Sequence, residues 1–190
     1  MHADYISNAT FKGENFGATP LPGKEYENCT FIECSFANAD LSRLIFSECV
    51  FEHCDLSLAK LKGATIRDIK FNHCKMLGLR FDECNTFLVS FGFENCTLNF
   101  SSFYQLKIRQ TIFNRCKLES VDFTQADLTK GLFDDCDLLN ATFDATTLSQ
   151  ADLRSAVNFS IDPEKNTVTK ARFSSHNLSG LLHKYKLDIR

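Results

Sequence analysis

The segment Cys29-Thr-Phe-Ile-Glu-Cys-Ser-Phe-Ala-Asn-Ala-Asp-Leu41 holds three successive copies of one five-residue pattern. Each copy has a large apolar residue at its centre, position i, and a small residue at position i−2. The small residues are Cys29, Cys34 and Ala39, and the centres that follow them are Phe31, Phe36 and Leu41. A fixed period that persists along a chain indicates a repeat architecture, so the extent of this pattern decides the fold class.

The same pattern runs through most of the chain. The first centres are Phe11, Phe16, Tyr26, Phe31, Phe36, Leu41, Phe46, Phe51, Leu56, Leu61, Ile66, Phe71, Met76 and Phe81. After a slip they resume as Phe93, Leu98, Phe103, Ile108, Phe113, Leu118, Phe123, Leu128, Phe133, Leu138, Phe143, Leu148 and Leu153. All nine cysteines occupy the small position, and alanine fills it in many other units. Because a free cysteine behaves as a compact hydrophobe, we expect this position to face the interior.

A period of five suits neither an α-helix nor a plain strand, whose apolar residues recur every three to four or every two positions. The chain must instead turn a corner after every unit, so that four units form one square coil of 20 residues. The cysteine spacing agrees, because three cysteines recur every 20 residues before the slip and three after it: Cys34, Cys54 and Cys74, then Cys96, Cys116 and Cys136. Stacked coils would lie roughly 4.8 Å apart, the spacing of hydrogen-bonded strands.

Three triplets, Ala39-Asp40-Leu41, Ala126-Asp127-Leu128 and Ala151-Asp152-Leu153, make the chain resemble the pentapeptide-repeat family, whose consensus is A-(D/N)-L-x-x. The resemblance covers about residues 9–178. It implies an all-β fold, a right-handed quadrilateral (square) parallel β-helix solenoid of about eight coils at the strand spacing, with a short C-terminal helical cap. The implied division is a β-helix over residues 1–176 and a C-terminal module over residues 177–190.

Three places interrupt the period. Thr19-Pro-Leu-Pro-Gly23 keeps the count, but prolines cannot donate to a strand ladder, which predicts a small loop or an irregular corner. Near residues 85–93 the register slips by two, which indicates either a bulge or a short functional loop. Residues 156–167 contain Pro163 and lack an apolar centre at Asn158, which predicts an irregular loop before the last units.

The tail after Asn177 leaves the five-residue period. Leu178, Leu181, Leu182 and Tyr185 are spaced as i, i+3, i+4 and i+7, which predicts a short amphipathic helix. Leu187 and Ile189 then alternate as in a brief strand. The end of a β-helix exposes core and unpaired backbone, so these six residues either cap the rod or join two copies of the chain. The Qnr and MfpA members of the family pair tail to tail through a similar module, so the resemblance implies a homodimer.

The net charge is only −3, but the charges are banded along the chain. Residues 25–55 carry −6, residues 56–118 carry +6, residues 119–164 carry −8 and residues 165–190 carry +5. The −8 band contains seven aspartates that are candidates for binding a partner: Asp122, Asp127, Asp134, Asp135, Asp137, Asp144 and Asp152. A narrow rod with outward carboxylates is a sparse imitation of duplex DNA, which carries one charge per roughly 1.7 Å of axis.

The resemblance to Qnr and MfpA implies a partner for such a surface. Those members engage the type II topoisomerases DNA gyrase and topoisomerase IV as DNA mimics. The implied function is therefore non-enzymatic: binding of a type II topoisomerase, without direct contact to nucleic acid, to inhibit it or protect it from quinolone-type poisons. The basic stretch 56–118 departs from a uniformly acidic mimic. The alternative is a structural interaction rod with an unrelated partner, whose charges only keep it soluble.

No sequence pattern points to catalysis or to a cofactor. The sequence lacks a Gly-rich phosphate loop, a nucleophile elbow and a His-Glu-x-x-His motif. A packed rod also offers little concave surface for a small-molecule substrate. His53 and His73 are 20 residues apart, with Glu33 in the same column, but exposed corner residues need no metal and we predict none.

The cysteines and the apolar runs bear on the compartment. Met1-His-Ala-Asp-Tyr5 is not a basic, apolar leader, and no run approaches the ~20 apolar residues of a membrane span. We therefore expect a cytoplasmic protein, away from membranes, with reduced and inert thiols. A further alternative, a metal or redox sensor that uses its thiols, requires cysteines that solvent can reach.

Overall fold

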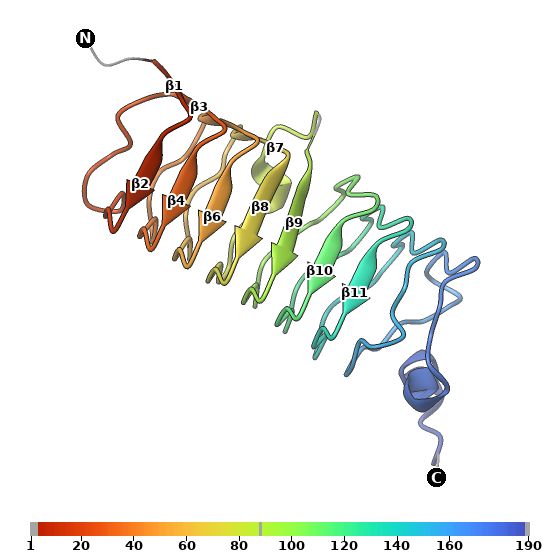
Figure 1. Cartoon of the computed structure of the whole chain (residues 1–190). Coiled ribbons are helices and arrows are strands. Elements are labelled where there is room, and N and C mark those ends of the chain that lie inside the picture. The colour runs from red at the N-terminus through yellow and green to blue at the C-terminus, as the bar shows by residue number, and fades with distance from the viewer. Residues whose placement is uncertain (1–3, 88, 189–190) are drawn as a thin grey trace.

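The computed structural model describes residues 4–87 and 89–188 and shows a parallel β-solenoid that advances as a single rod (Figure 1). Paired residues of neighbouring strands are 20 positions apart, as with Phe31 beside Phe51. Four five-residue units therefore do form one coil, and the predicted β-solenoid is confirmed.

Two parallel sheets form adjacent faces of the rod. Face A carries a four-stranded sheet: β1 (Tyr5–Ser7), β3 (Glu25–Glu27), β5 (Ile45–Ser47) and β7 (Thr65–Arg67). It continues in single bridges through Lys107, Asp127, Thr147 and Thr167. Face B carries a seven-stranded sheet: β2 (Thr10–Lys12), β4 (Thr30–Ile32), β6 (Val50–Glu52), β8 (Ile69–Asn72), β9 (Phe91–Glu94), β10 (Ile112–Asn114) and β11 (Leu132–Asp134).

The other two faces are held by single bridges. Face C consists of Asn15, Ser35, Asp55, Lys75, Thr97, Lys117, Asp137 and Val157, and face D contains Asp40 with Lys60, then Arg80 with Ser102, Asp122 and Thr142. At the corners, residue i+2 adopts a positive φ, for example 53° at Glu33. This left-handed conformation turns the chain sharply within one residue, and asparagine or glycine tolerates it best. Each strand is consequently only three or four residues long.

The centres and the small residues fill the interior. All nine cysteines are buried and free, as their shared position predicts. The rings of Phe93, Phe113 and Phe133 stack at centroid distances of 5.2 and 5.0 Å, one ring per coil. Cys54 Sγ donates to the carbonyl oxygen of Phe31 at 3.3 Å, so the thiol satisfies its polar group inside the core.

The register slip is an insertion of two residues that leaves the rod intact. Phe71 pairs with Phe93, an interval of 22 positions. The Asn85 amide still donates to the carbonyl of the preceding coil at 2.8 Å, so the extra residues follow it. Thr86 is exposed and is not a centre, and Phe87 is 74 % exposed. The columns of side chains resume at β9, after the short 3-10 helix η1 (Phe81–Glu83).

The predicted short C-terminal helical region is confirmed, in a tighter form than an α-helix. It forms two 3-10 helices, η2 (Ser175–Leu181) and η3 (His183–Tyr185). Gly180 packs directly on the Phe159 ring, where an added Cβ atom would overlap Cε2, so this close approach requires glycine. The predicted brief strand is wrong at Leu187, which is irregular, and Ile189 lies outside the described residues. No helix in residues 4–87 or 89–188 is long and apolar enough to cross a membrane.

Candidate functional site

The seven aspartates predicted to bind a partner wind around the rod. Asp127 lies on face A, Asp134 and Asp152 on face B, Asp137 on face C, Asp122 and Asp144 on face D, and Asp135 at the corner between faces B and C. The residues on either side of each centre point outward, so a band that is continuous in sequence must pass over every face. We call this band, residues 119–164, the acidic collar.

Arginines pair with two of these aspartates. Arg109 Nε lies 2.7 Å from Asp127 Oδ2, reaching across from the neighbouring coil. Arg154 Nη2 lies 2.7 Å from Asp152 Oδ2, and Arg172 Nη1 is 3.7 Å from the same oxygen. Hydrogen bonds from Arg154 hold the pKa of Asp152 below its ordinary value. Both carboxylates therefore stay ionised but present little net charge to a partner.

The corner between faces B and C keeps its charge. Within the described residues, no lysine or arginine forms an ion pair with Asp134, Asp135 or Asp137, although Lys117 is the bridge neighbour of Asp137 one coil earlier. Ser155 Oγ donates to Asp134 Oδ1 at 2.8 Å, and Asn158 Nδ2 donates to Asp137 Oδ1 at 2.8 Å. These neutral donors orient the carboxylates without cancelling their charge. Three acids without an ion pair thus lie within four residues of sequence.

This acidity does not continue along the corner toward the N-terminal end. One coil before Asp135 the corner residue is Arg115, whose Nη2 lies 2.6 Å from Glu94 Oε1. Earlier on the same corner, the rings of His53 and His73 stack at a centroid distance of 4.7 Å. The side chains described contain no group of three that could hold a metal ion. The negative charge at this corner is therefore local, not a stripe along the rod.

The tail residues predicted to join two copies divide into packed and exposed. Leu181 packs against the core and Leu182 is half-buried. The other three described residues are largely exposed: Leu178 at 44 %, Tyr185 at 52 % and Leu187 at 57 %. The tail thus covers the end of the core and also leaves apolar surface, so dimerisation stays a prediction.

The sequence interpretation missed an exposed apolar corner between faces C and D. Leu58 is 60 % exposed and Phe100 is 62 % exposed, on either side of Gly78. Both bulky residues adopt a positive φ, of 57° and 62°, which is uncommon for such side chains. The signal was present in the sequence, because these two i+2 positions hold large apolar residues where the other units have polar or small ones.

Comparisons with known proteins agree with this architecture. A model of the pentapeptide repeat region matches residues 24–103, and a model of eight copies of pentapeptide repeats matches residues 122–157. Two trypsin-treated variants of QnrB1, described as a plasmid-mediated fluoroquinolone resistance protein, have similar structures. The first has a TM-score of 0.65 at 18 % identity over 98 % of this chain and 100 % of the other. The second has a TM-score of 0.63 at 18 % identity over 95 % of this chain and 98 % of the other. Among curated protein sequences no match is found.

Proposed function

Because the chain belongs to the pentapeptide-repeat family, we propose that it is a non-enzymatic interaction protein that binds a type II topoisomerase, DNA gyrase or topoisomerase IV, in place of DNA. The observation that carries the proposal is the corner of Asp134, Asp135 and Asp137 on a narrow rod, whose carboxylates accept from neutral donors and form no ion pair among the described residues. The likeness to QnrB1, a fluoroquinolone resistance protein, supports this partner class and an effect on quinolone-type poisons.

Binding in this proposal is electrostatic and local. A surface that holds duplex DNA presents lysines and arginines to phosphates, and the collar offers carboxylates in their place. Ser155 and Asn158 already orient two of these carboxylates, so little side-chain entropy is lost on contact. Since the exposed charges are screened by salt, affinity falls as ionic strength rises.

Dimerisation would place two such surfaces on one rod. Residues 165–176 separate the acidic collar from the tail, so a tail-to-tail homodimer would place one collar on each side of the middle of one long rod (Figure 1). The exposed Leu178, Tyr185 and Leu187 supply apolar area for that contact. We place the protein in the cytoplasm, where such a partner acts and where nine unpaired thiols stay reduced.

A supercoiling assay tests the proposal. Purified protein is titrated into DNA gyrase, with and without a fluoroquinolone, and compared with the triple variant D134K/D135K/D137K. A matched control, E33K/E48K/E52K, makes the same change of charge near the other end of the rod. Inhibition or rescue that the first variant loses and the control keeps supports the collar as the contact. Equal behaviour of both variants, or no effect at any concentration, contradicts it.

A second candidate, a rod with an unrelated partner, is favoured by the exposed Leu58 and Phe100. Under that proposal their replacement by serine removes the biological effect of the protein in cells. The lysine changes in the collar then have no consequence. If the lysine changes in the collar remove the effect and the serine changes at Leu58 and Phe100 do not, the topoisomerase proposal is supported.

A further inference from the structure

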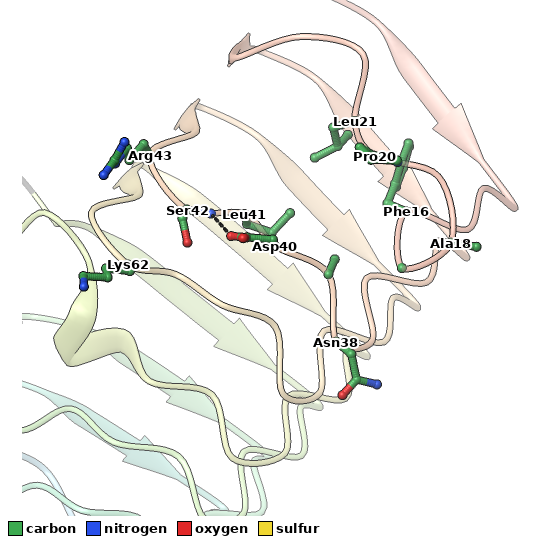
Figure 2. Close-up of a pocket in the computed structure, with 12 residues that line it drawn as sticks. Phe16, Ala18, Pro20, Leu21, Asn38, Asp40, Leu41, Ser42, Arg43 and Lys62 are labelled. Carbon is green, nitrogen blue, oxygen red and sulfur yellow. Dashed lines mark hydrogen bonds between the residues drawn. The ribbon is translucent and has the colours of Figure 1, made fainter.

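A groove lies at the N-terminal end of face D, beneath the proline loop of residues 17–23 (Figure 2). The loop, with Ala18, Pro20 and Leu21, forms one wall, and residues 38–43 form the other. Its volume is about 730 Å³, within the range of roughly 300–1,000 Å³ found for ligand sites. Most of the rod is packed solid, so this hollow needs a structural reason.

The groove exists because the loop omits one rung of the solenoid. In a regular coil the residue before the centre bonds twice to the preceding coil. Ser35 does so, because its N–H donates to the Glu14 carbonyl at 2.8 Å and its carbonyl accepts from Phe16 at 2.7 Å. Asp40 is the equivalent residue on face D. In the part of the chain that the structure describes, neither its N–H nor its carbonyl has a backbone partner.

A third backbone group on this edge also lacks its regular bond. On face B the carbonyl of Ile32 accepts from the Gly13 amide at 2.9 Å. The equivalent amide on face D, that of Gly23, donates instead to the Tyr26 hydroxyl at 2.8 Å. The Ser42 carbonyl is therefore left facing the groove. Residues 40–42 form a short open strand edge with one N–H and two carbonyls available.

The side chains around this edge are apolar below and basic at the rim. Phe16 and Leu41 are buried and line the groove. Arg43 and Lys62 are exposed at its end, and neither takes part in an ion pair among residues 4–87 and 89–188. The Asp40 carboxylate accepts from the Ser42 amide at 3.0 Å. Two cations against one carboxylate give the groove a net positive charge.

We propose that this groove binds an extended acidic peptide, which adds a parallel strand beside residues 40–42. The peptide backbone supplies the missing rung by accepting from the Asp40 N–H and donating to the Asp40 and Ser42 carbonyls. An apolar side chain rests on Phe16 and Leu41, while carboxylates meet Arg43 and Lys62. In such strand addition, main-chain bonds give affinity and side-chain sites give specificity. The site is remote from the acidic collar and does not depend on topoisomerase binding.

The test uses fluorescence anisotropy with the full chain and a fluorescein-labelled hexapeptide of alternating glutamate and leucine. The decisive variants are Asp40→Pro and Asp40→Ala. Asp40→Pro removes the backbone N–H while the residue keeps an extended backbone conformation, and Asp40→Ala removes only the carboxylate. We expect Asp40→Pro to weaken binding about tenfold relative to Asp40→Ala, the upper range for one hydrogen bond. We expect R43E/K62E to weaken it further, and the distant control K130E/K170E to leave it unchanged.

The controls separate the proposal from simpler ones. Circular dichroism of each variant verifies that the solenoid is intact. A peptide of alternating lysine and leucine should not bind, nor should a glutamate–leucine peptide with N-methylated backbone. Equal affinity of Asp40→Pro and Asp40→Ala overturns the proposal, as does absence of binding by the acidic peptide. Binding of a labelled DNA duplex that needs Arg43 and Lys62 but ignores Asp40→Pro assigns the groove to phosphates instead and also overturns it.

Discussion

Both ends of the rod contain an interruption with proline on face D, but only the C-terminal one is sealed. At the N-terminal end, Pro20 and Pro22 lift the chain away and leave the groove of Figure 2. At the C-terminal end, Pro163 lies on the same face of its coil, yet the neighbouring Phe159 and Asn166 are buried. The same kind of interruption therefore has two outcomes.

Amide side chains make the difference. Asn166 Nδ2 donates to the Phe143 and Asp162 carbonyls at 3.0 Å each, and its Oδ1 accepts from the Thr146 amide at 2.8 Å. Asn177 Nδ2 donates to two further carbonyls in the last coil, each at 3.0 Å. A missing rung can thus be replaced by side chains that bond in both directions. The N-terminal loop has no such amide over residues 40–42.

The contrast predicts unequal costs for removing an apolar side chain at each end. Phe159→Ala should lower the free energy of unfolding by about 3–5 kcal/mol, because a buried ring leaves a cavity. Leu21→Ala should lower it by no more than about 1 kcal/mol, since Leu21 is only half-buried in the open loop. Urea unfolding followed by circular dichroism measures both. Similar losses would mean that the N-terminal loop is packed as tightly as the C-terminal one.

A smaller contrast is expected between two asparagines. Asn166→Ala leaves buried backbone groups without partners, at a cost of about 1–3 kcal/mol. Asn15 Oδ1 accepts from the exposed Gly17 and Ala18 amides, so Asn15→Ala should cost only about 0.5–1 kcal/mol. Thermal unfolding of the two variants in parallel gives the order. An equal or reversed order would show that the C-terminal seal does not depend on Asn166.

The open end should also be the first to admit a thiol reagent. All nine cysteines are buried, and burial raises the pKa of Cys49 to about 11 and that of Cys84 to about 12, so these two stay protonated and unreactive. Without denaturant we expect no rapid labelling by Ellman's reagent. During slow labelling, Cys29 and Cys34 should react several-fold faster than Cys136, as measured by mass spectrometry of peptides. Rapid labelling of any cysteine would revive the thiol-sensor alternative.

The smallest expected effect is on the docking of the C-terminal tail, which ion pairs help to hold. Lys184 Nζ lies 2.8 Å from Asp162 Oδ1 and 2.7 Å from Glu164 Oε2, and its hydrogen bonds lower the pKa of both carboxyls. Folded-state pKa values below the unfolded ones stabilise the docked tail above about pH 4, and this contribution is lost as pH falls through the lowered values.

Limited chymotrypsin cleavage near Tyr185 reports on that docking. Lys184→Ala should speed cleavage at neutral pH, and so should high salt on the wild-type chain, because the pairs are exposed. The matched control, Lys186→Ala, should leave the rate unchanged. If Lys184→Ala cleaves no faster than the control, the packing of Gly180 and Leu181 and the Asn177 hydrogen bonds hold the tail without the ion pairs.

The repeat made the interior predictable and the surface less so. Cys34, Cys54 and Cys74 lie 20 residues apart, and one period requires them to share a column, which the buried thiols bear out. The pairing of Arg109 with Asp127 depends instead on how a long side chain extends between coils. No pattern of residue types states that geometry, so the sequence overestimated the free charge of the collar.

Breaks in the period were located by the sequence but not resolved by it. Pro20 and Pro163 each predicted an irregular segment. Whether other side chains pack over that segment depends on residues distant in sequence, such as Gly180 and Asn177. The tail shows the same limit. Spacing alone predicted a short helix, but it did not predict that the helix forms as two 3-10 segments with Gly180 against Phe159.

Displacement of DNA from its enzyme tests the central claim most directly. A fluorescein-labelled duplex is bound to DNA gyrase, and the protein is added while anisotropy is followed at low and at physiological salt. If the collar substitutes for DNA, the wild-type protein releases the duplex competitively, D134K/D135K/D137K does not, and E33K/E48K/E52K behaves as wild type. Formation of a ternary complex that keeps the duplex bound, or release by the triple aspartate variant, would contradict the account.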